Sequence, residues 1–156
     1  MLLILILLFP VLGIPLVVIA STHSRRAAAW TAAGAMAAAL AVLLTLARST
    51  FAGTVLIARQ VWLPEWGLDL ALRLDGLGFL FAALILGIGL LIVLYAAYYL
   101  PEKDRLGRFY ALLLAFAASM LGIVLSENIL LLLVFWEITS LTSFLLIAYK
   151  HEAHDA

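Results

Sequence analysis

Long runs of apolar residues dominate the chain, and short polar segments separate them. Five runs are long enough to cross the hydrocarbon core of a bilayer as helices, at about residues 2–20, 27–47, 77–100, 109–126 and 128–148. No Lys or Arg lies inside any of these five runs. The pattern predicts an all-α integral membrane protein, with residues 1–156 forming a single membrane segment of about five transmembrane helices and no soluble domain.

The polar segments differ in length, and the longest covers residues 48–76. Apolar and polar residues alternate from Leu68 to Leu74, which is the period of a β-strand, and a Pro-Glu-Trp-Gly sequence precedes them. We therefore expect a small hairpin on the outer face of the membrane, where Trp62 and Trp66 suit the interface. Asp75 and Glu127 each precede an apolar run, and both are predicted to cap the helix that follows. The alternatives are ion entry at Asp75 and the lining of an outer exit by Glu127.

The second run repeats small residues every four positions, at 33, 37 and 41 and at 34 and 38. Such spacing allows helix backbones to approach closely. The alternative is a helix that is simply rich in alanine.

Basic residues are unequally shared between the two sets of loops. One set holds six basic residues and the other three, and basic loops stay in the cytoplasm. This asymmetry predicts a multi-pass protein of the plasma membrane with its N-terminus outside and its C-terminus in the cytoplasm. The six are Arg25, Arg26, Lys103, Arg105, Arg108 and Lys150; the three are Arg48, Arg59 and Arg73.

Composition narrows the function classes. The formal net charge is zero, which argues against a nucleic-acid partner, and the absence of Cys excludes thiolate metal sites and iron–sulfur clusters in this chain. No nucleotide-binding loop, nucleophile triad or zinc spacing is present, so we expect no cofactor, no metal and no enzymatic chemistry. The first apolar run lacks a preceding basic segment, which favours a retained helix over a cleaved signal.

Glu137 is the carboxylate that the apolar pattern does not explain. It lies in the middle of the last apolar run, where a charge costs from about 3 to more than about 10 kcal/mol. A chain retains such a group chiefly when it pairs with a cation or carries protons. We therefore expect Glu137 to lie among protein helices and to act as a proton carrier.

Other polar residues near Glu137 are weaker candidates for proton translocation. Ser140 lies one helical turn away on the same face, where its hydroxyl can bond the carboxylate or hold a water. Hydroxyls at 139, 142 and 143 are expected to bond carbonyls of their own helix. His151 and His154 are interpreted as part of a solvated cytoplasmic tail, and the alternative is that they collect protons, because His titrates near neutrality.

Several segments resemble a known family. The sequence F-W-E-I-T-S-L-T-S-F-L-L-I-A-Y (135–149) resembles the fifth transmembrane helix of the antiporter-like subunits, which include the large A-type subunit of Mrp-type multisubunit Na⁺/H⁺ antiporters and chain 5 of respiratory complex I. The sequence L-R-L-D-G-L-G-F-L-F-A (72–82) resembles the start of the third helix of that family. V-L-Y-A-A-Y-Y-L (93–100) is more similar to the Mrp branch, and the resemblance extends over about residues 60–150.

The resemblance implies the N-terminal part of a helical proton-channel subunit. The functional carboxylate of the family falls on Glu137, and its usual partner is a Lys on a later, broken helix that this sequence does not contain. The implied partners are those remaining helices, other membrane subunits of the same antiporter complex, the lipid bilayer, protons and Na⁺. The chain is therefore expected to be a fragment or a split subunit.

Three functions remain open. The first is a proton-translocating subunit of a monovalent cation (Na⁺)/H⁺ antiporter with Glu137 as its midplane carrier. The second is an antiporter-like pumping subunit of a complex I or membrane hydrogenase type complex. The third is a structural membrane scaffold without transport of its own.

Overall fold

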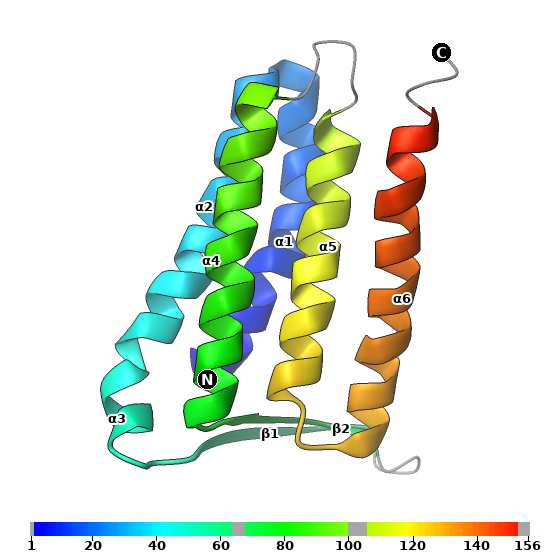
Figure 1. Cartoon of the computed structure of the whole chain (residues 1–156). Coiled ribbons are helices and arrows are strands. Elements are labelled where there is room, and N and C mark those ends of the chain that lie inside the picture. Colours follow the sequence, from blue (N-terminus) through cyan, green and yellow to red (C-terminus); the bar gives the residue numbers. More distant parts are fainter. Residues whose placement is uncertain (1, 64–67, 100–105, 153–156) are drawn as a thin grey trace.

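Five long helices stand side by side in the computed structural model, and a two-stranded hairpin lies across one end of them (Figure 1). The structure describes residues 2–63, 68–99 and 106–152. All five long helices are long and apolar enough to cross a membrane, which confirms the five predicted spans. The elements are α1 (Leu2–His23), α2 (Arg25–Thr45), α3 (Ala47–Phe51), β1 (Leu56–Leu63), β2 (Leu68–Leu74), α4 (Gly76–Tyr99), α5 (Leu106–Leu125) and α6 (Ile129–Glu152).

Polar side chains mark the starts of three long helices. Ser24 has an extended backbone between α1 and α2, and its hydroxyl accepts from the Ala27 N–H at 3.0 Å. Asp75 Oδ1 accepts from the Gly78 N–H at 2.8 Å, which confirms the predicted cap of α4. The cap of α6 is Asn128, whose Oδ1 accepts from the Leu130 N–H at 2.8 Å. Each such cap is worth about 1 kcal/mol.

The prediction that Glu127 caps α6 is therefore wrong. Its side chain is exposed, and its backbone N–H donates to the carbonyl of Ala71 in β2 at 2.9 Å. An isolated bridge between Leu72 and Ser126 adjoins this bond. The Glu127 backbone thus connects the hairpin to the segment between α5 and α6, and the side chain of Asn128 caps the helix.

The hairpin pairs β1 and β2 antiparallel, with Leu56 opposite Leu74 and Arg59 opposite Ala71. The predicted alternation holds from Leu72 to Leu74, because these two leucines are 0% exposed while Arg73 is exposed, with its Nη2 atom 3.6 Å from Asp75 Oδ2. It fails at Ala71, which is buried although the alternation puts it on the polar side. The two leucines close the adjacent end of the bundle core. The Pro-Glu-Trp-Gly sequence and Trp66 lie outside the described residues. The short helix α3 was not predicted.

Glycines set the closest approaches between helices. A Cβ placed on Gly13 of α1 would lie 2.7 Å from the Cβ of Ala35 in α2, and one on Gly89 of α4 would lie 2.6 Å from the sulfur of Met36. On α5, a Cβ at Gly107 would overlap Ser21 of α1. Another Cβ, at Gly122, would overlap the ring of Phe135 in α6. Contacts this short require the absence of a side chain, so these glycines determine the distances between neighbouring helices.

Most small residues of the four-residue repeat in α2 are not its buried ones, although Ala33 packs against the core. Ala28, Ala32 and Ala39 are fully buried, together with Met36 and Leu43. By contrast, residues 37 and 41 of the predicted repeat are exposed and residue 33 is only partly buried. Alanine occurs on every side of this helix, so the spacing of alanines does not define a buried face. The two large buried side chains, Met36 and Leu43, define it.

Gly122→Ala is expected to destabilise the protein, because the added methyl group meets the Phe135 ring and overpacking typically costs about 1–3 kcal/mol. Gly34→Ala is the matched control: it lies in α2 with no atom within 4 Å of the added Cβ, and alanine gains up to about 1 kcal/mol in a helix. The measurement is the thermal midpoint of the purified protein in detergent. A Gly122→Ala variant as stable as Gly34→Ala would show that the glycine does not determine the contact between α5 and α6.

Candidate functional site

Glu137 lies close to the centre of the last spanning helix. It is eight residues beyond Ile129 and twelve before Tyr149, the bounds of the spanning part of α6. At 1.5 Å per residue these separations are about 12 and 18 Å, so its Cα is about 3 Å from the middle of the span. Glu137 is therefore far from both ends of the apolar segment.

One face of α6 carries its contacts with the rest of the chain. Phe135 lies against Gly122 of α5, and the ring of Tyr149 lies 5.6 Å from that of Phe109, also on α5. Leu131 and Thr142 are buried along the same side. Only 11% of the residues in the most apolar stretch of α6 are buried, against 50% in α5, so α6 stands at the edge of the bundle (Figure 1).

Glu137 and Ser140 lie on the opposite, open face. Glu137 follows Phe135 by two residues, which turns its side chain about 200° away from the contact with α5. Both Glu137 and Ser140 are exposed, one helical turn apart, as the spacing predicted. They are surrounded on this face by large exposed apolar side chains: Leu133, Trp136, Leu141, Phe144 and Ile147.

The neighbouring hydroxyls bond the backbone of their own helix. Thr139 donates to the Phe135 carbonyl at 2.8 Å, and Thr142 donates to the Ile138 carbonyl at 2.8 Å. This outcome confirms the expectation for these two residues. Ser140 donates no such bond among the described residues, which leaves its hydroxyl available to a group on the Glu137 face.

No described residue of this chain pairs with the Glu137 carboxylate. An ion pair within the described part joins Arg73 to Asp75, at the hairpin end and far from α6 mid-span. The described helices of this chain leave Glu137 exposed, and its burial among protein helices stays a prediction. An apolar face with a carboxylate at its centre is costly to leave against acyl chains.

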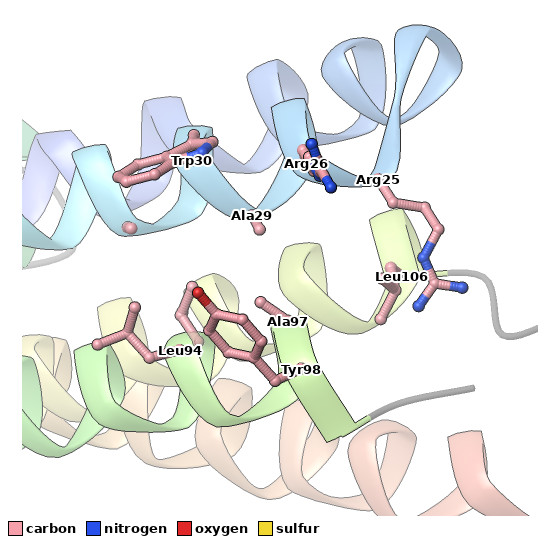
Figure 2. A pocket seen from close by; sticks show the side chains of 10 residues that line it. Arg25, Arg26, Ala29, Trp30, Leu94, Ala97, Tyr98 and Leu106 are labelled. Carbon is pink, nitrogen blue, oxygen red and sulfur yellow. The ribbon is translucent and has the colours of Figure 1, made fainter. Parts of the chain in front are cut away.

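The other predicted site residues are placed less fully. His151 lies in the last turn of α6, and His154 lies outside the described residues. Within the described ranges, no group of three His, Cys, Asp or Glu side chains gathers in a way that could hold a metal ion. The structure also brings together Arg25, Arg26, Trp30 and Tyr98 around a groove that sequence reasoning missed (Figure 2). The spacing of four residues between Arg26 and Trp30 could have indicated the α2 side of the groove. Tyr98 comes from a distant segment, and the sequence gives no sign that it lies nearby.

Comparison with known proteins gives relatives that agree with one another in family. Residues 62–110 match the family described as NADH-ubiquinone oxidoreductase (complex I), chain 5 N-terminus. The chain is 46% identical over 149 residues to the probable K⁺/H⁺ antiporter A/B subunit of Rhizobium meliloti (strain 1021), covering 95% of this chain and 15% of that protein. It is 48% identical over 110 residues to the Na⁺/H⁺ antiporter A1 subunit of Staphylococcus aureus (strain JH9), covering 70% of this chain and 14% of that protein.

Solved structures show the same helical arrangement. A chain of the Mrp complex from Dietzia sp. DQ12-45-1b superposes with a TM-score of 0.70 and 33% identity, over 89% of this chain and 15% of that chain. A chain of an archaeal membrane-bound sulfane sulfur reductase superposes with the same TM-score at 23% identity, over 90% of this chain and 22% of that one, and so shares the fold. The chain thus spans about 15% of the length of the curated relatives.

Proposed function

Because this chain corresponds in sequence and in fold to the N-terminal part of the A-type subunit of Mrp antiporters, we propose that it forms part of a proton path in a monovalent cation/proton antiporter. The observation that carries the proposal is the position of Glu137 at mid-span, on a face of α6 that the described helices leave open. Glu137 is the carrier in this path.

The open face of α6 needs a protein partner. The relatives are several times longer than this chain, so they contain segments that this sequence does not include. We place a basic side chain, a Lys in the related subunits' pattern, on one of those segments and opposite Glu137. Such a partner compensates the charge in hydrocarbon, which the described part of this chain does not do.

Proton movement follows from two opposed effects on a buried carboxyl group. Removal from water favours the neutral acid, and a nearby cation favours the carboxylate. When the basic partner moves away, Glu137 takes up a proton; when it returns, the proton is released toward the other side. Ser140, one turn away, orients the carboxyl group or a water beside it.

The relatives carry names that specify both Na⁺ and K⁺ as the exchanged cation. We propose Na⁺ for this chain, with other membrane subunits of the same antiporter complex as partners. A second candidate is a pumping subunit of a complex I type enzyme, which is favoured by the family matched at residues 62–110. The antiporter is preferred because the relatives with 46–48% identity are named antiporter subunits.

The proposed location is the plasma membrane, with the hairpin outside and the C-terminal end of α6 in the cytoplasm. Figure 1 places the N-terminus at the hairpin end of the bundle and the C-terminal end of α6 at the other. Arg25, Arg26 and Arg108 lie at helix ends remote from the hairpin, where the positive-inside rule expects basic residues.

Glu137→Ala is expected to reduce cation-dependent proton antiport roughly a hundredfold or more, because the titratable group is removed and its basic partner is left uncompensated. Glu137→Gln should transport as poorly but assemble better, since an amide still forms hydrogen bonds. Glu137→Asp should retain an intermediate rate, because the charge stays and only its reach shortens. The measurement is Na⁺-induced or K⁺-induced dissipation of a pH gradient in membrane vesicles.

Glu127→Gln is the matched control, since it neutralises an exposed carboxylate at the hairpin end. It should transport at the wild-type rate. His154→Ala should also change the rate little. Assembly is checked on the same vesicles, and wild-type antiport by assembled Glu137→Ala would remove Glu137 from the proton path.

The proposed orientation predicts which single cysteines react from outside the cell. The chain has no native Cys, so each substitution introduces its only thiol. Arg59→Cys in the hairpin should react with an impermeant reagent in intact cells, whereas Arg25→Cys and Lys150→Cys should react only after permeabilisation. Labelling of Lys150→Cys but not Arg59→Cys in intact cells would reverse the orientation.

A further inference from the structure

A groove runs between α4 and α5 from the hairpin end toward the other end of the bundle. Its mouth is a cavity of about 320 Å³ beside the end of β2, and its apolar part is a second cavity of about 320 Å³ further along the two helices. Phe81 of α4 and Val124 of α5 line both cavities, so the two adjoin at these side chains. Figure 1 shows α4 and α5 side by side, with the hairpin across their lower ends. Glu137 and Ser140 line neither cavity.

The apolar part of the groove has exposed walls and a buried floor. Phe81, Leu84 and Ile88 form a wall on α4, and each is about half exposed. Leu113 and Ala117 of α5 are buried and form the floor. The described lining residues of this part carry no charged group and no hydroxyl. Packing among the described helices therefore leaves the groove open, and an occupant must be hydrocarbon along this length.

The width of the groove favours a single acyl chain over a helix. The apolar cavity follows α4 from Phe81 to Ile92, which is about 16 Å of helix. Its volume spread over that length gives a mean cross-section of about 20 Å², against roughly 80 Å² for a helix with its side chains. A helix lying over the groove would leave this space empty, which close packing disfavours. An extended acyl chain fits inside it.

The mouth of the groove carries one charge of each sign. Arg73 Nη2 lies 3.6 Å from Asp75 Oδ2, and the two side chains are 48% and 40% exposed. This separation is too long for a hydrogen bond, and exposed ion pairs contribute little to stability, so a ligand can reach both groups. Asp75 Oδ1 accepts from the Gly78 N–H, which leaves Oδ2 as the atom that faces a ligand. The connections from β2 to α4 and from α5 to α6, which surround the mouth, both belong to the described residues.

Hydrogen-bond acceptors gather around the mouth. One is Asp75 Oδ2. The Ser126 hydroxyl lines the mouth and donates its proton to the Gly122 carbonyl at 2.6 Å, so its lone pairs remain as acceptors. Val124 also lines the mouth and belongs to the last turn of α5, where the carbonyl groups carry partial negative charge. These acceptors suit a primary ammonium group, which has three N–H donors, better than a quaternary one, which has none.

We propose that this groove binds one phosphatidylethanolamine molecule, with its ammonium group on Asp75 Oδ2, its phosphate beside Arg73 and one acyl chain along Phe81, Leu84 and Ile88. The two opposite charges of the mouth match the two opposite charges of this headgroup. Leu84 is nine residues beyond Asp75, about 14 Å along α4, which lies within the hydrocarbon of one leaflet. This site requires only that the five helices cross a membrane, and it is independent of the proton path proposed for α6.

The test places a tryptophan in the groove of the protein, or of the assembly in which it is isolated, reconstituted in lipid nanodiscs. Brominated acyl chains quench tryptophan on contact, and the groove signal is the difference in fluorescence between Leu84→Trp and the wild type. Brominated phosphatidylethanolamine, at a low mole fraction in phosphatidylcholine, should quench this signal with roughly fivefold higher apparent affinity than brominated phosphatidylcholine, which has no N–H to donate to Asp75. Ile88→Trp, one turn deeper, is a second reporter in the groove.

Two matched controls accompany this measurement. Leu80→Trp lies one turn from Leu84 on α4, is also about half exposed and lines neither cavity, so both lipids should quench it equally. Asp75→Asn in the Leu84→Trp protein should bring the two lipids to equal affinity, while α4 keeps its cap because Asn caps helices as well as Asp does. Glu127→Gln neutralises an exposed carboxylate at the same end, outside the groove, and should leave the preference intact.

Equal quenching by the two lipids at both groove positions overturns the proposal. A preference for phosphatidylethanolamine that persists in folded Asp75→Asn overturns it as well. No quenching at the groove positions would show that another protein segment covers the groove instead of lipid. Higher apparent affinity for brominated phosphatidylglycerol than for brominated phosphatidylethanolamine would assign the groove to anionic lipid and contradict the pairing of the ammonium group with Asp75.

Discussion

The contact of Phe135 with Gly122 determines how α6 lies on the rest of the bundle, and so where its carboxylate points. The ring occupies the space that a side chain at position 122 would take, which fixes both the closeness and the rotation of the two helices. Tyr149 against Phe109 repeats the contact on the same side of α6, further along it. With these contacts in place, Glu137 can only lie on the other side.

The position of Glu137 matters because α6 is long and apolar enough to lie in a bilayer. In hydrocarbon every polar group must find a partner within the protein, and α6 shows how far this chain meets that demand. Thr139 and Thr142 bond their own helix, and Asn128 satisfies the first amide groups. Glu137 is the ionisable group in the described span that finds no partner in the described chain. The charge that makes a carboxylate costly in hydrocarbon also makes its protonation sensitive to a nearby cation, which is the basis of the role that we propose for Glu137.

Much of the fold could be predicted from the sequence, because membrane helices depend on length and apolarity, which are local properties. The five spans, the hairpin and the Asp75 cap all followed from such patterns. The buried face of α2 could not be predicted from alanine spacing, since alanine lies on all sides of this helix. Packing against α1 and α4 determines which side is buried. Glu127 was misassigned because its backbone pairs with β2, a contact between distant segments.

The candidate site was predictable to a similar extent. Helical periodicity predicts that Glu137 and Ser140 lie on the same face. The chemistry of the hydroxyl group predicts that Thr139 and Thr142 bond carbonyls of their own helix. Which face turns away from the bundle depends on Gly122 in a different helix. The groove beside Arg25 needs Tyr98 from α4, and nothing local to α2 indicates it.

If Glu137 carries protons in a cation/proton antiporter, as we propose, its protonation changes when the bound cation is exchanged. The most direct measurement is the infrared difference spectrum of the reconstituted assembly on exchange of Na⁺ or K⁺ for an inert cation. A protonation change at Glu137 predicts a change in the carbonyl stretch of a protonated carboxyl group in the wild type, and its loss in Glu137→Gln. The same band change persisting in assembled Glu137→Gln would contradict the proposed role of this residue.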